Sequence, residues 1–336
     1  LSPELIAATE VDGNPVQVGY RLERGVYFSS SNDDYTDHFV EASGDFELNS
    51  RHRISALAQY EDGHEDRGTG FSIGSGLEIS TPDTYKNSNL SAEYSYVAAT
   101  TDGMLTFKAR RQTLDYDRTE DAYIIRDRAK NMIGAEFGYQ IGAATSMVVD
   151  VTKTFVKYDE QLDLVTRDND ETRVLVGVVW ESTAATTGFA KVGYKEKDFD
   201  NEARGTFYGT DWEVGIDWQP VSYSTVRIST SADTFETNGE GDFIRGQNYS
   251  VRWNHDWLER VSTSFSVTQQ NDEYVFNELD IVNRDDELMN YSAALNYQAR
   301  RWLKFSTFYQ YTDRDSNRDT IGYDRSEVGL TVEVTL

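Results

Sequence analysis

Two alternating runs joined by a tight turn make up residues 205–233, GTFYGTDWEVGIDWQPVSYSTVRISTSAD. In the first run Trp212 and Trp218 alternate with Glu213 and Asp217, and strand side chains alternate between two faces with period two. One face is therefore apolar and the other charged, and we expect the turn at residues 219–222. A soluble antiparallel sheet gives the same pattern, so its recurrence along the chain decides the fold.

The alternation recurs over almost the whole chain. Short turns are expected near residues 49–51, 101–103, 142–144, 184–186, 220–221, 258–259 and 300–301. Their spacing of roughly 36 to 52 residues accommodates two strands and one longer loop. Together with a first strand around Val16–Leu22 and a last one ending at Leu336, the pattern predicts about sixteen strands, with about eighteen as the alternative.

The connections are of two kinds, which sets the expected topology. Between the short turns lie longer segments rich in Asp, Asn, Glu, Arg and Gly, and these are expected to be loops: residues 29–37, 62–85, 116–130, 158–172, 199–206, 234–244, 271–287 and 312–324. Outer-membrane barrels divide their connections in this way, with short periplasmic turns and long outer loops. The sequence therefore predicts an all-β transmembrane antiparallel up-and-down β-barrel, with both termini periplasmic.

Composition limits the alternatives. The chain has 336 residues, no Cys, 4 Pro and a formal net charge of −26, without a break in composition. We expect residues 1–15 to form a short periplasmic segment and residues 16–336 a single barrel, in a mature outer-membrane protein of a Gram-negative bacterium whose signal peptide has been removed. Nucleic acid is excluded as a partner, because phosphate backbones need a basic face.

Tryptophans gather close to the expected short turns. An outer-membrane barrel carries aromatic girdles at the membrane interfaces. The predicted girdle residues are Trp180, Trp218, Trp253, Trp257 and Trp302. The lipids of the outer membrane are therefore expected partners.

Charged side chains recur in mid-strand on the face opposite the apolar one. The apolar stripes by themselves could also belong to a soluble sandwich, propeller or β-helix. An open soluble sheet of sixteen strands, however, would leave edge strands with unpaired backbone groups. A water-filled lumen explains the charges better. The predicted pore-lining residues are Arg21, Glu93, Lys108, Arg110, Glu136, Asp150, Lys191, Lys195, Glu213, Asp217, Arg227, Arg252, Lys304 and Glu327.

No pattern in the sequence predicts catalysis. The four histidines lie beside no nucleophile motif and have no metal-binding spacing on one strand. The acidic loop at Asp168–Glu171 lacks the Gly and the distal Glu of a twelve-residue calcium loop. We expect no catalytic residues, no metal and no cofactor.

Several features carry a family resemblance: the Gly19-Tyr20 strand, outward strand ends in Tyr116-Asp117, Tyr158-Asp159 and Phe199-Asp200, and the closing SEVGLTVEVTL. With these the chain resembles, from about Val16 onward, the β-barrel porin family encoded with exopolysaccharide synthesis and export genes. The resemblance implies an outer-membrane exit for an exopolysaccharide or capsular polysaccharide in biofilm formation. It also implies a periplasmic polysaccharide-export protein as partner.

Three functions are open at this point. The first is the polysaccharide conduit that the resemblance implies. The second is a general diffusion porin, selective for cations because an acidic mouth repels small anions. The third is an adhesin that binds through its acidic loops and has a plugged lumen.

Overall fold

The fold is all-β. The computed structural model describes residues 1–336 except 74–78, 100, 119–122, 124, 160–165, 184, 238–239, 276–282 and 336. Within those residues the chain forms one 17-stranded antiparallel sheet and three single-turn 3-10 helices. No helix in this described part is long and apolar enough to cross a membrane. Leu336 and parts of the expected long loops lie outside the described residues.

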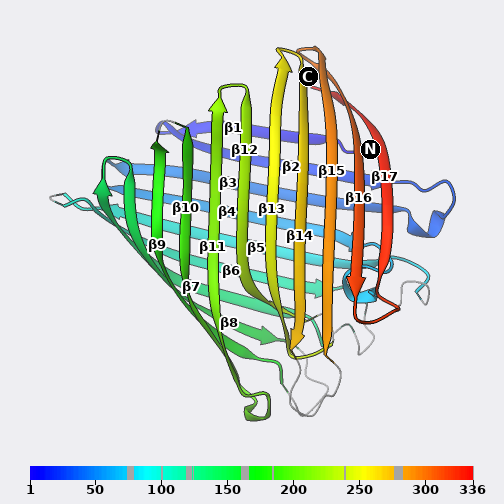
Figure 1. Ribbon diagram of the computed structural model, residues 1–336, viewed down its shortest axis with the longest axis horizontal. Coiled ribbons are helices and arrows are strands. Elements are labelled where there is room, and N and C mark those ends of the chain that lie inside the picture. The colour runs from blue at the N-terminus through cyan, green and yellow to red at the C-terminus, as the bar shows by residue number, and fades with distance from the viewer. Residues whose placement is uncertain are drawn as a thin grey trace. The chain divides into compact units, whose positions relative to one another are not determined.

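The strands follow each other in up-and-down order (Figure 1). Their bounds are β1 Glu4–Val11, β2 Asn14–Gly25, β3 Tyr35–Asn49, β4 His52–Glu65, β5 Asp83–Val97, β6 Gly103–Tyr116, β7 Arg128–Gly142, β8 Thr145–Tyr158, β9 Asn169–Thr183, β10 Thr186–Phe199, β11 Thr206–Val221, β12 Ser224–Glu236, β13 Phe243–Leu258, β14 Val261–Val275, β15 Arg284–Arg300, β16 Leu303–Ser316 and β17 Tyr323–Val334. The 3-10 helices are η1 Ser31–Asp33, η2 Gly70–Ser72 and η3 Glu202–Arg204. The predicted antiparallel up-and-down order is confirmed.

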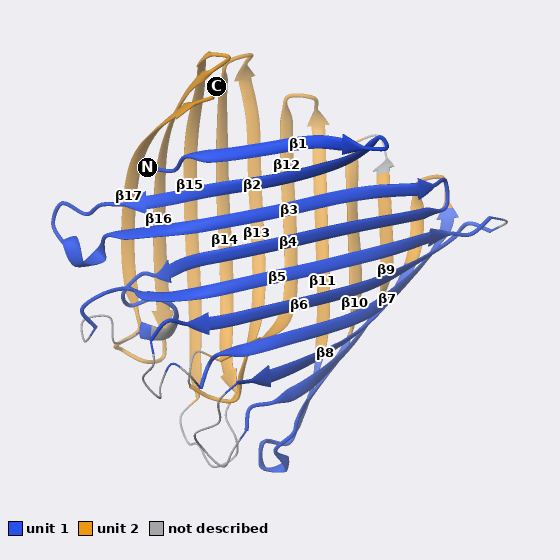
Figure 2. Ribbon diagram, turned by 180° about the vertical axis from the view of Figure 1, so that it is seen from behind, with its two compact units in different colours: residues 1–141, 148–175, 194–209 blue, residues 142–147, 176–193, 210–336 orange. Residues whose placement is uncertain are grey.

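The chain divides into two compact units, which Figure 2 colours separately. Unit 1 comprises residues 1–141, 148–175 and 194–209, and unit 2 comprises residues 142–147, 176–193 and 210–336. Each unit is described by itself below. In both units the strands run antiparallel to their neighbours, joined by short turns at one end and by longer connections at the other.

Strand register confirms the predicted alternation. In unit 1 Val40 pairs with Tyr60 and Ala58 with Leu90, so the apolar side chains share one face. In unit 2 Val251 pairs with Val267 in the same way. This apolar face is open, since Leu90 is 59% exposed. Large side chains exposed along a continuous face are unusual in soluble monomers and typical of a wall in contact with lipid.

One strand was missed by the sequence pattern. Residues 4–11, expected to precede the barrel, form β1 and pair with β2 from Glu4↔Arg21 to Val11↔Asn14. The turn between them uses Asp12 and Gly13, both with positive φ, as a two-residue hairpin favours. The amino group of Leu1 donates to the carbonyl of Arg24 at 2.8 Å, so within unit 1 this residue lies at the end of the long connections and not, as expected, at the end of the short turns.

The turn between β11 and β12, expected at residues 219–222, lies later in the chain. β11 continues through Pro220 to Val221, and β12 begins at Ser224. The register shifts between Trp218 and Val221, so a bulge takes up Gln219 and Pro220. Proline lacks the N–H that a sheet requires and is accommodated at such an irregularity.

Candidate functional site: the polar face of the sheet

Lys108 forms the centre of a buried charge cluster on the polar face of unit 1. Its Nζ lies 2.9 Å from Glu136 on β7 and 2.7 Å from Asp150 on β8. The residue opposite Lys108 on β7 is Gly134, so no side chain blocks its reach to β8. A methyl group at Gly134 would lie 2.8 Å from Thr152 Cγ2 and 3.1 Å from the Val151 carbonyl oxygen, so a larger residue would force its neighbours to shift. Three predicted pore-lining residues are thus in direct contact.

A row of polar side chains crosses unit 2. Register aligns Asp217 with Arg227, Arg227 with Arg252, and Arg252 with Ser266. Arg227 donates from Nε and Nη2 to Asp217 at 2.5 and 2.7 Å, the bidentate geometry that suits Arg and carboxylate. Further ion pairs on this face join Lys191 to Glu213 at 3.3 Å and Lys304 to Glu333 at 3.0 Å.

The remaining predicted lining residues also lie on polar faces but have other surroundings. Arg21 stands 3.9 Å over the ring of Phe39, and Glu327 pairs with Arg325 at 2.9 Å. Glu93 and Arg110 are exposed, whereas Lys195 is buried. The placement on one face agrees with the sequence analysis, and passage of solutes along it stays a prediction.

The predicted girdle residues lie near the short turns of unit 2. Trp218, Trp257 and Trp302 are exposed, and Trp180 and Trp253 are half-buried. Trp253 stacks on Phe265 with ring centroids 5.7 Å apart, and His255 lies 4.2 Å from Trp257. Contact of these rings with a membrane interface stays a prediction.

Sequence reasoning missed a row of tyrosine–carboxylate pairs in unit 1. Four tyrosine hydroxyls near the long connections each donate to a carboxylate of another strand: Tyr35 to Glu23 at 3.3 Å, Tyr85 to Glu61 at 2.9 Å, Tyr116 to Glu65 at 3.0 Å and Tyr123 to Asp83 at 3.0 Å. No residue spacing marks these pairs in advance, because each joins residues from 12 to 51 positions apart. They place aromatic rings beside fixed hydrogen-bond acceptors.

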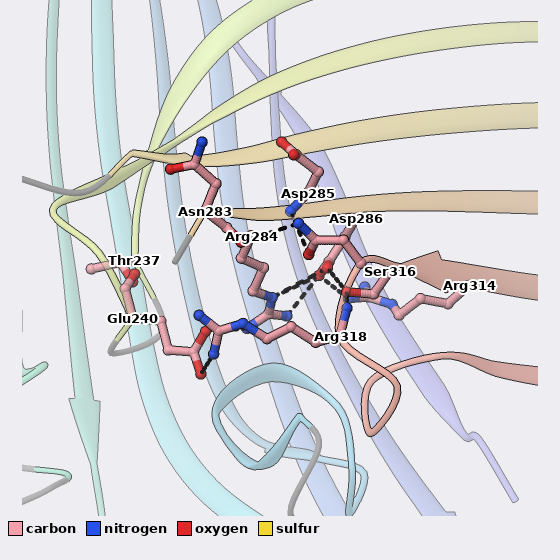
Figure 3. Close-up of polar contacts among 10 residues, drawn as sticks. Thr237, Glu240, Asn283, Arg284, Asp285, Asp286, Arg314, Ser316 and Arg318 are labelled. Atoms are coloured by element: carbon pink, nitrogen blue, oxygen red, sulfur yellow. Dashed lines mark hydrogen bonds and ion pairs between the residues drawn. The ribbon is translucent and has the colours of Figure 1, made fainter. Parts of the chain in front are cut away.

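A second missed group is an arginine network in unit 2 (Figure 3). Arg284 is 1% exposed, lies 2.6 Å from Asp286 and 3.1 Å from Glu240, and stacks on Tyr274. Asp286 also accepts from Ser316 Oγ and Arg314, at 2.7 and 3.1 Å.

The same network extends to the β16–β17 connection, because Glu240 forms a second ion pair with Arg318. Arg318 Nη1 lies 3.1 Å from Glu240 Oε1, and both side chains are drawn in Figure 3. Glu240 therefore bridges two arginines from different segments. The network joins the β12–β13 connection, β15, β16 and the β16–β17 connection.

Long connections of unit 1 are held to one another by ion pairs. Arg67 binds Asp33 in η1 through Nε and Nη2, at 2.5 and 2.7 Å. These hydrogen bonds lower the pKa of Asp33 and raise that of Arg67. Asp117 similarly accepts from Lys86 at 2.6 Å, which lowers the Asp117 pKa. Burial lowers the pKa of Arg126, in the same β6–β7 connection as Asp117, to about 10.

Within the described residues no cluster of three or more His, Cys, Asp or Glu side chains could hold a metal ion. The polar face instead offers paired charges, amides and tyrosines. Such groups bind polar molecules by hydrogen bonds and ion pairs, and rings of charge influence which ions pass a pore.

An antiparallel up-and-down sheet with one exposed apolar face and one charged face is the architecture of outer-membrane β-barrel proteins. The chain belongs to the family described as "Putative beta-barrel porin 2", which matches residues 1–336. No curated protein matches the chain by sequence.

Solved structures show the same fold at low sequence identity. The ferric citrate transporter FecA in the unliganded form is 11% identical with a TM-score of 0.54, covering 98% of this chain and 60% of that one. The FrpB iron transporter from Neisseria meningitidis is 11% identical with a TM-score of 0.53, covering 96% and 61%. The FpvAI–pyocin S2 complex is 10% identical with a TM-score of 0.51, covering 98% and 58%. The chain thus spans about three fifths of the length of these proteins, and the likeness concerns the fold alone.

Proposed function

We propose that this porin is the outer-membrane conduit for a secreted polysaccharide. The observation that carries the proposal is the make-up of its polar face, where amides, carboxylates and tyrosines stand side by side in register. A hydroxyl group both donates and accepts hydrogen bonds, so a face with both kinds of partner suits a hydroxyl-rich chain.

The first five strands illustrate this composition. Asn89 Nδ2 donates to Gln59 at 2.9 Å, and Gln59 Nε2 donates to Glu41 at 2.8 Å. Because neighbouring groups already bond to one another, each exchange with a passing hydroxyl replaces a bond of similar strength. Many weak contacts of this kind hold a polymer without trapping it.

Transport would require further partners. A periplasmic polysaccharide-export protein would deliver the polymer, and outer-membrane lipids would surround the apolar face. The fold and the family support an outer-membrane position, and the polymer and the export protein belong to the proposal.

Deletion of the gene in the bacterium that encodes it tests the proposal. Polysaccharide is then quantified outside the cells and in the periplasm, with a complemented strain as control. We expect extracellular polymer to fall and periplasmic polymer to accumulate. Unchanged secretion in a strain without a second copy of the gene would refute the export function.

A cation-selective diffusion porin is the second candidate. The acidic balance favours it, since the chain has 58 acidic against 32 basic residues. Purified protein in planar bilayers separates the two functions. A diffusion porin conducts continuously and prefers potassium to chloride, whereas a conduit closed by its loops conducts little until its polymer or partner is added.

A further inference from the structure

A groove of about 310 Å³ lies on the polar face of β1–β5 in unit 1. Two adjacent rows of the sheet build it. One row runs from Glu4 through Arg21, Phe39 and Glu61 to Asn87, and the next from Ile6 through Gly19, Glu41 and Gln59 to Asn89. The groove is therefore made by strands, whose positions the sheet fixes.

Gly19 leaves the floor of the groove open. It lies between Ile6 and Glu41 in register. A Cβ added there would meet nothing nearer than Ile6 Cγ1 and the Leu5 carbonyl oxygen, both at 4.0 Å. A small side chain would fit without strain, and a large one would fill the space.

The groove has hydrogen-bonding groups of both kinds. Asn89 Oδ1 is buried and has no hydrogen-bond partner among the described residues, so a ligand hydroxyl that reaches it would satisfy an open acceptor. Asn89 Nδ2, Gln59 and Glu41 form the chain of hydrogen bonds already described. The Arg21 guanidinium covers one face of the Phe39 ring, 3.9 Å from its centroid.

Charge selects among hydroxyl-rich ligands. The lining contains the carboxylates of Glu4, Glu41 and Glu61 and the guanidinium of Arg21, a formal charge of −2 from three negative groups and one positive. Arg21 is in addition paired with Glu23 at 2.5 Å. An acidic ligand would meet net repulsion, and a neutral or amine-bearing one would not.

We propose that this groove binds single sugar units of a polysaccharide without acidic groups, and that it discriminates against uronic-acid polymers. The inference rests on the proposed function, because it names the substrate class of the same polar face. It adds a binding site of defined residues and a charge preference.

The test measures binding to the full chain in lipid nanodiscs by ligand-observed NMR titration. Three hexasaccharides serve as probes: a neutral glucan, a glucosamine oligomer and a galacturonic acid oligomer. The first two should bind, and the third about tenfold more weakly, the ratio that corresponds to one unfavourable charge contact. Tightest binding by the galacturonic acid oligomer, or no binding by any probe, would overturn the proposal.

Two leucine substitutions separate the groove from the rest of the face. Gly19→Leu fills the groove and should weaken neutral-glucan binding at least about tenfold, as expected when hydrogen-bonding groups become inaccessible. Gly138→Leu is the matched control. Gly138 is a buried glycine of unit 1 that lies outside the groove, and a Cβ added there would meet nothing nearer than Val148 Cγ1 at 3.8 Å. Equal effects of both substitutions would contradict the assignment.

Glu41→Gln tests the charge preference by itself. It keeps the shape and removes one negative charge, so binding of the galacturonic acid oligomer should strengthen several-fold while glucan binding changes little. No change in the ratio would refute the charge argument.

The binding and secretion experiments fail independently. If deletion abolishes secretion but Gly19→Leu leaves glucan binding intact, the groove assignment is wrong and the export function stands. If secretion survives deletion while the groove still binds glucan, the export function is wrong and the binding site stands.

Discussion

The ammonium nitrogen of Lys108 on β6 lies 2.7 Å from Asp150 on β8 and reaches it over the bare backbone of Gly134 on β7. Glu136 completes the cluster at 2.9 Å. One cation thus neutralises two carboxylates from two successive strands. Such an arrangement makes the cation more important to stability than either acid alone.

Removal of that cation should destabilise the protein. Lys108→Met leaves two mostly buried carboxylates close together, and loss of one member of a buried pair costs about 3–5 kcal/mol. Urea unfolding in lipid vesicles measures the change. The triple variant Lys108→Met, Glu136→Gln, Asp150→Asn is the control and should recover much of the loss. A single variant as stable as the parent would show that the cluster is fully hydrated.

Reversal of a charge in the Asp217–Arg227–Arg252 row should change ion selectivity if the row lines the pore. Arg227→Glu adds two negative charges in effect and should shift the reversal potential in a potassium chloride gradient toward cation preference. Planar-bilayer recording measures it. Arg227→Lys, which keeps the charge, should leave the reversal potential unchanged. Identical potentials for both variants would place Arg227 outside the conducting path.

The arginine network predicts unequal effects of two substitutions. Arg284→Met leaves Asp286 buried with fewer partners and should cost about 3 kcal/mol or more. Arg318→Met breaks a pair in which Arg318 is 29% and Glu240 40% exposed, so its cost should stay within about 1 kcal/mol. Urea unfolding compares them. Similar losses of unfolding free energy in the two variants would indicate that Arg318 contributes as much to stability as the buried Arg284.

Acid should loosen the contact between Arg67 and Asp33. The pKa of Asp33 is lowered in the folded state from its ordinary value of 3.8, chiefly by the hydrogen bond from Arg67. Its contribution to stability is therefore fully present above about pH 4 and is lost as the pH falls through the lowered value. Hydrogen exchange of residues 27–34 between pH 5 and 2.5 should report the change. Asp33→Asn should remove this pH dependence. If the variant showed the same dependence of hydrogen exchange on pH as the parent, the role of Asp33 would be refuted.

Single-tryptophan variants should reveal membrane depth. Trp218, Trp257 and Trp302 lie beside short turns and are exposed, so lipids brominated near the headgroup should quench them most strongly. Trp212 lies six residues before Trp218 in β11, about 20 Å along the strand, and should respond to bromine placed deeper. The reverse order would place the interface elsewhere.

The sequence predicted the strands because alternation with period two is a local signal. Sixteen expected strands correspond to β2–β17, and the apolar faces agree with register. β1 was missed because ELIAATEV does not alternate cleanly, and its place comes from pairing with β2. Strand ends were also underestimated, since β14 and β15 extend to Val275 and back to Arg284 inside a segment expected to be loop.

Side-chain partners were less predictable than faces. The alternation of side chains along β6 predicted that Lys108 lies on the polar face. Its contacts with β7 and β8 depend in addition on Gly134 and on the order of the three strands. The Arg284 network joins segments more than 40 residues apart in the chain, as from Glu240 in the β12–β13 connection to Arg284 in β15. Its only trace in the sequence is the Arg-Asp-Asp run at 284–286, where Arg284 and Asp286 fall on one face.

Several strands are longer than a membrane crossing requires. β13 and β15 have 16 and 17 residues, whereas a tilted strand crosses the hydrocarbon layer with about 9–11. In an outer membrane the surplus would form sheet beyond the hydrocarbon layer, and Arg284 and Asp286 lie in the first residues of β15, next to the long connections. The connecting segments can therefore be exchanged or extended, for instance to display a foreign peptide at residues 200–205, while the strand-borne groups keep their places.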